Sequence, residues 1–68
     1  MTNRTNTIIS KAVSKGIDTK TLAKKTGIPL STLYRRLLNP GRFTLDELQA
    51  IDRVLRFDEA EFAELVRG

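Results

Sequence analysis

The side chains best equipped for chemistry in this sequence are its arginines and lysines, and most of them fall in the first two thirds of the chain. Residues 1–42 contain nine basic residues and a single acidic one, Asp18, for a local charge of +8. Residues 43–68 contain three basic and seven acidic residues, for a local charge of −4. Clustered cations attract phosphates and other anions. The pattern predicts that one half faces a polyanion, although a solvated surface with chance clustering would give the same counts.

Catalysis is not predicted, because the side chains on which many enzymes rely are missing. The sequence has neither cysteine nor histidine. It therefore has no thiolate nucleophile, no histidine base and no zinc site of the usual ligand types. We predict a protein that is not an enzyme and that has no catalytic residues, no metal and no cofactor.

The length of 68 residues leaves room for one small domain spanning 1–68. Hydrophobic residues make up 40% of the chain and charged residues 29%, which is typical of a folded domain rather than a disordered one. No apolar run approaches the roughly 18 residues that cross a membrane, and no signal-peptide pattern opens the chain. We therefore expect a cytoplasmic protein that has no membrane partner and no small-molecule ligand.

Turn and capping residues divide the chain into five predicted helices, and no useful stretch alternates as a strand would. The polar run Thr5-Asn6-Thr7 can cap the first helix, and Gly16 can end it. Pro29 is preset for the first turn of the third helix. The expected ranges are 5–15, 18–26 with its cap, 29–38, and two further helices within 44–67. The predicted fold class is all-α, a compact five-helix bundle.

Paired capping signals mark the start of three of these helices. Asp18 is a predicted N-cap, with Ile17 and Leu22 as a hydrophobic staple around it. The same arrangement recurs twice, as a capping box with its staple: Thr44 and Glu47 with Phe43 and Leu48, then Asp58 and Glu61 with Phe57 and Phe62. The turn Asn39-Pro40-Gly41 separates the third helix from the fourth.

Apolar residues at helical spacing predict the core. Its expected members are Ile8, Ile9, Ala12, Val13, Leu22, Ala23, Ile28, Leu33, Leu37, Leu48, Ile51 and Leu55.

The segment 19–38 has the spacing of two helices that cross closely. Ala23 is the small residue needed at the crossing, and Gly27, four residues on, can take the positive φ of the bend. Leu33 then locks the second helix against the first. This spacing predicts a helix-turn-helix, whose second helix enters the major groove of DNA. A helical hairpin without a binding role is the alternative.

These residues resemble the Cro/C1-type helix-turn-helix regulators of bacteria and their phages, also called the Xre family. The resemblance covers about residues 5–67 and implies a five-helix, lambda-repressor-like DNA-binding domain. The residues that carry it are Leu22-Ala23, Gly27-Ile28, Ser31-Thr32-Leu33-Tyr34-Arg35-Arg36-Leu37 and Phe43-Thr44-Leu45-Asp46-Glu47-Leu48.

The resemblance also implies which residues touch DNA. The expected base contacts lie on the third helix: Leu30, Ser31, Thr32, Tyr34 and Arg35. The expected phosphate contacts are Thr19, Lys20, Arg36, Asn39 and Arg42. Arg35 is the first choice for direct readout, because its planar fork matches the acceptors of guanine. Pro29 and Arg36 depart from the family pattern, in which a Ser or Thr cap and a buried aliphatic residue are common.

The function that we predict is that of a transcriptional regulator, a phage Cro-like repressor that binds a palindromic operator as a dimer in the bacterial cell. One recognition helix covers few bases, so two half-sites are expected. The expected dimer surface is Phe57, Phe62 and Val66, and dimerisation is expected to be weak until DNA completes it. An antitoxin or an excision accessory factor would use the same fold, and a protein-interaction module is a further alternative.

Overall fold

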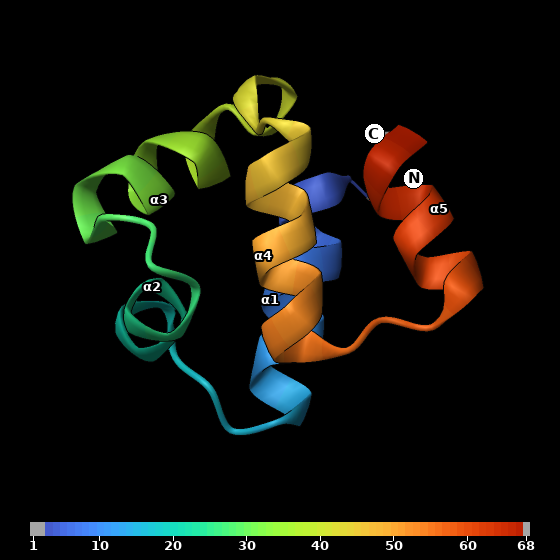
Figure 1. Ribbon diagram of the computed structural model, residues 1–68, viewed down its shortest axis with the longest axis horizontal. Coiled ribbons are helices and arrows are strands. Elements are labelled where there is room, and N and C mark those ends of the chain that lie inside the picture. The colour runs from blue at the N-terminus through green and yellow to red at the C-terminus, as the bar shows by residue number, and fades with distance from the viewer. Residues whose placement is uncertain (1–2, 68) are drawn as a thin grey trace.

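The computed structural model describes residues 3–67, which form five α-helices and one short 3₁₀ helix without any strand in that range. The elements are α1 (Arg4–Ser14), α2 (Thr19–Thr26), α3 (Leu30–Leu38), η1 (Pro40–Arg42), α4 (Leu45–Leu55) and α5 (Glu59–Arg67). The prediction of an all-α five-helix bundle is confirmed. In Figure 1, α4 lies in front of α1 at the centre, α2 and α3 lie on one side, and α5 lies on the other.

Short-range capping contacts begin the helices close to where the sequence predicts. The Asp18 carboxylate accepts a hydrogen bond of 2.7 Å from the backbone N–H of Thr21 at the start of α2. α1 begins earlier than expected, because Asn3 rather than the 5–7 run caps it, through a 2.8 Å bond from Asn6 N–H. Pro29 is the N-cap of α3 rather than its first residue, since its ψ of 139° is extended.

Both predicted capping boxes are present, and they fix the two C-terminal helices. At α4, the Thr44 hydroxyl accepts from Glu47 N–H at 3.1 Å, and the Glu47 carboxylate accepts from Thr44 N–H at 2.9 Å. At α5, Asp58 accepts from Glu61 N–H at 2.7 Å, while Glu61 accepts from Asp58 N–H at 2.9 Å. Each box satisfies two backbone donors that have no partner within the helix.

The core differs from the predicted list in five places. Eleven hydrophobic residues are buried: Ile8, Ala12, Leu22, Ala23, Ile28, Leu33, Phe43, Leu48, Ile51, Leu55 and Leu65. Val13 was expected inside but is 71% exposed, because the buried stripe of α1 runs through Ile8 and Ala12. Ile9 and Leu37 are only half-buried. Phe43 and Leu65 were not expected; Phe43 is the residue before the α4 cap, which the staple turns inward.

The two ends of the chain are tied together on the α5 side of the molecule (Figure 1). The Arg4 guanidinium donates to the carbonyls of Leu65 at 2.7 Å, Val66 at 3.1 Å and Pro40 at 2.6 Å. Lys11 pairs with Glu61 at 2.9 Å, which joins α1 to α5. These contacts join α1, η1 and α5, while α2 packs on the core through Leu22 and Ala23. Among the helices described, none combines the length and the apolar character that a membrane crossing needs.

Candidate nucleic-acid interface

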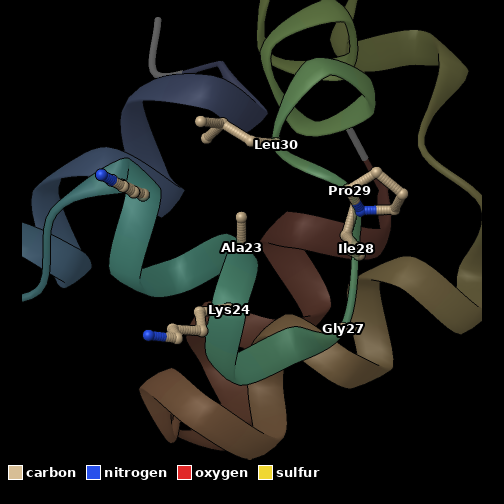
Figure 2. A pocket seen from close by; sticks show the side chains of 7 residues that line it. Ala23, Lys24, Gly27, Ile28, Pro29 and Leu30 are labelled. Carbon is tan, nitrogen blue, oxygen red and sulfur yellow. The ribbon is translucent and has the colours of Figure 1, made fainter.

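The turn between α2 and α3 has the geometry that the sequence predicts. Ala23 is 5% exposed beneath α3, and Gly27 ends α2 with φ of +80°. The Gly27 N–H donates to the Ala23 carbonyl at 3.0 Å, and the Thr26 hydroxyl donates to the Leu22 carbonyl at 2.8 Å. Figure 2 shows the chain passing from Ala23 through Gly27 and Ile28 to Leu30. The left-handed conformation of Gly27 sets the direction of α3 relative to α2.

The outer face of α3 carries most of the side chains predicted to read bases. Leu33 is fully buried and anchors the helix. Ser31, Tyr34 and Arg35 are exposed, whereas Thr32 is half-buried. Leu38 is 81% exposed on the same outer face, four residues after Tyr34, and sequence reasoning missed it. The spacing from Tyr34 was the signal that could have found it.

Leu30 has a different environment from the rest of that face. It is half-buried and packs against the core. Together with Lys20, Ala23 and Lys24 it lines a hollow between α2 and the first turn of α3 (Figure 2). Its lining is mostly apolar and includes two lysines. Lys20 is exposed and Thr19 half-buried at the start of α2.

A second basic hollow lies at the other end of α3. It is lined by Arg35 and Arg36 from the last turn, by Asn39, and by Arg42 of η1. All four were predicted to contact DNA, and the fold brings them together. Guanidinium groups and an amide around one depression make an anion-binding surface, because they donate several hydrogen bonds and carry positive charge. Basic hollows therefore flank the outer face of α3 at both ends.

Arg36 is held in place by the capping box of α4. Its Nε donates to the Glu47 carboxylate at 3.0 Å, the same oxygen that accepts from Thr44 N–H. Burial raises the pKa of Glu47, but the hydrogen bonds from Thr44 and Arg36 outweigh it, so the pKa lies below its ordinary value. Arg36 is half-buried at this site, so part of its charge is matched within the protein before any phosphate arrives.

Replacing Glu47 with Gln should lower the free energy of unfolding at pH 7 by about 1 kcal/mol, since a neutral amide bonds Arg36 more weakly. Because the pKa is lowered on folding, the carboxylate's stabilisation is fully present above its ordinary pKa of 4.5 and is lost as the pH falls through the lowered value.

Urea titrations at neutral and at acid pH measure the free energy of unfolding of the unmodified protein and of Glu47→Gln. The difference between these two free energies should become smaller in acid. Glu64→Gln is the matched control, because the Glu64 side chain is 65% exposed and its pair with Arg67 at 3.9 Å contributes little. A difference in unfolding free energy that is as large in acid as at pH 7 would contradict a stabilising role for the ion pair between Arg36 and Glu47.

The residues predicted to form a dimer surface lie along α5 and the loop before it. Phe57 and Phe62 are half-buried and pack against the core, and the Lys11 ammonium lies 6.0 Å from the Phe57 ring centroid. Both phenylalanines therefore contribute to the core as well, because the staple across the α5 cap turns them inward. Val66 is 42% exposed.

A short helix pair crossing at Ala23, with its outer helix exposed between two basic hollows, defines a helix-turn-helix domain. The chain belongs to the Cro/C1-type HTH DNA-binding domain family, whose model matches residues 10–67. It is thus a DNA-binding protein of the regulator class, as the sequence resemblance predicts. Comparison with curated proteins and with solved structures gives no significant match.

Proposed function

We propose that this protein is a sequence-specific regulator that inserts α3 into the major groove of double-stranded DNA. The observation that carries the proposal is the exposed face of α3, bordered by Lys20 and Lys24 at one end and by Arg35, Arg36 and Arg42 at the other. Nine residues at about 1.5 Å each make α3 about 13 Å long, close to the width of the groove. Basic groups at both ends can then meet the phosphates of the two strands.

Within this arrangement the exposed side chains take different tasks. Arg35 reads guanine through its bidentate fork, and Ser31 with Tyr34 contacts neighbouring base edges. Arg42 and Asn39 hold the backbone on one side, with Arg36 supporting them from its bond to Glu47. Lys20 and Thr19 hold it on the other side, where the start of α2 suits a phosphate. Leu30 and Thr32, both half-buried, contact bases at the edge of the α3 surface that faces the groove.

Selection of bound sequences from a random duplex library tests the proposal. We expect one motif to be enriched, with a guanine at a fixed position opposite Arg35. A pool that stays random after several rounds, from protein that circular dichroism shows to be folded, would refute sequence-specific binding.

The protein is further proposed to act as a phage Cro-like repressor that occupies a palindromic operator as a dimer in the bacterial cytoplasm. One helix covers too few bases for useful specificity, which favours two half-sites about one turn apart. Val66, exposed near the C-terminal end of α5, is the centre of the proposed contact, and the half-buried Phe57 and Phe62 contribute only their exposed edges. So small a contact is weak in free solution.

Replacing Val66 with Glu should reduce cooperative binding to a two-half-site duplex, because it places a charge in the small apolar contact. Binding to a single half-site and the helix content should stay nearly unchanged. Val13→Glu is the matched control, since Val13 is 71% exposed on α1. Sedimentation of free and DNA-bound protein gives the stoichiometry, and one protomer saturating the full site would contradict the dimer.

A further inference from the structure

Leu38 is the most exposed large hydrophobic side chain among the residues that the structure describes. It is 81% exposed, compared with 71% for Val13, 54% for Leu45 and 52% for Tyr34. An isolated exposed leucine is ordinary on a protein surface. Leu38, however, is not isolated, because Tyr34 lies one turn before it on the same face of α3. The two form an exposed apolar pair.

The apolar pair lies on the same face of α3 as the residues proposed to contact bases. At 3.6 residues per turn, Leu38 falls between Tyr34 and Arg35 around the axis of α3, and close to Ser31. Leu38 also lines a depression with Asn39, Pro40, Gly41 and Arg42. An aliphatic side chain therefore lies at the C-terminal end of the face proposed to meet DNA, beside Arg42, which is proposed to hold the phosphate backbone.

The major groove offers an aliphatic side chain one favourable partner. Guanine, adenine and cytosine present hydrogen-bond donors and acceptors there, which a leucine cannot satisfy, whereas thymine adds a 5-methyl group. Burying two apolar groups against each other is favourable, and covering an unpaired polar edge is costly. Leu38 should thus favour a thymine and disfavour the other bases at its position.

We propose that Leu38, with Tyr34 beside it, recognises the 5-methyl group of a thymine in the major groove. This inference rests on the proposed function, because it requires α3 to lie in the groove. The thymine lies near the edge of the half-site, since Leu38 is in the last turn of α3 and borders η1. Leu38 is then a specificity-determining residue that acts through shape and apolar contact, next to the hydrogen-bonding readout by Arg35.

Replacing thymine with deoxyuridine tests this contact, because the exchange removes the methyl group and leaves every hydrogen-bonding group of the base in place. The probe is the duplex enriched from the random library, with each thymine of the half-site replaced singly. Fluorescence anisotropy should show about fourfold weaker binding of the full-length protein at one such position, as expected for losing one buried methyl group. At that position Leu38→Ala should bind the thymine and uracil duplexes equally.

Two further variants separate recognition of the methyl group from a general effect. Leu38→Met keeps an apolar side chain of similar volume and should retain a preference for thymine. Val13→Ala trims another exposed apolar residue, on α1, and should leave the full fourfold ratio unchanged. Because Leu38 is so exposed, its replacement should not alter the unfolding curve.

The outcomes distinguish this inference from the proposed function. Tight binding of the enriched duplex with no loss at any uracil overturns the methyl contact and leaves the proposed function standing. A thymine preference that persists in Leu38→Ala assigns the contact to another residue and also overturns the inference. Failure to enrich any duplex overturns the proposed function, and the inference falls with it.

Discussion

Raising the potassium chloride concentration from about 50 to about 200 mM should weaken binding of the enriched duplex by roughly 150-fold. Besides Arg35, which is assigned to guanine, the two hollows at the ends of α3 present four basic groups to the phosphates: Lys20, Lys24, Arg36 and Arg42. Each phosphate that a basic group neutralises releases condensed counterions, at about −0.9 in the slope of log affinity against log salt. Four contacts therefore predict a slope of about −3.6.

Anisotropy titrations at several salt concentrations give this slope directly. Arg42→Ala should make it shallower by about one, because it removes one phosphate contact. Arg53→Ala is the matched control, since Arg53 is exposed on α4, outside both hollows, and should leave the slope unchanged. A slope between zero and −1 would mean that the basic half of the chain is only a solvated surface.

Replacing Arg35 with Ala should cost about 1–3 kcal/mol of binding free energy and relax the preference at one base pair. The loss is large because a bidentate pair with guanine is removed and the guanine acceptors lose their partner. Arg42→Ala should weaken all sequences about equally, since a phosphate contact carries no base information. Both arginines are exposed and line the same hollow, so they are well matched in surroundings.

Repeating the library selection with each variant measures the difference. The Arg35→Ala motif should lose its fixed guanine, while the Arg42→Ala motif should match that of the unmodified protein at lower yield. If the two variants give the same motif, the assignment of Arg35 to base recognition and of Arg42 to phosphate contact is wrong.

The parts of the fold that could be predicted are those fixed by contacts a few residues apart. Asp18, Thr44 and Asp58 cap helices through bonds to residues three positions on, so their signals are complete within a short window. The same holds for Gly27 and the crossing at Ala23, which place α3. From these the helix-turn-helix and its outer face follow.

What the sequence could not specify depends on contacts between distant segments. Arg4 donates hydrogen bonds to Pro40, Leu65 and Val66, which lie 36, 61 and 62 positions further along the chain. No local sequence pattern predicts contacts over such separations. The pairing of Arg36 with Glu47 spans the turn at η1, which is why its half-buried state was harder to foresee than the exposure of Arg35. The burial of Leu65 likewise depends on how α5 docks beside α1.

Amide chemical shifts, followed during titration with a duplex that carries a single half-site, show whether the exposed face of α3 is the surface that reads DNA. A half-site leaves the proposed dimer contact unused, so changes report the DNA surface alone. We predict that the shifted resonances are those of Ser31, Tyr34, Arg35 and Leu38, together with Lys20 and Arg42, while α5 from Glu59 to Arg67 stays unchanged. Shifts confined to α5 and the outer side of α1, with α3 unaffected, would exclude α3 as the DNA-reading surface.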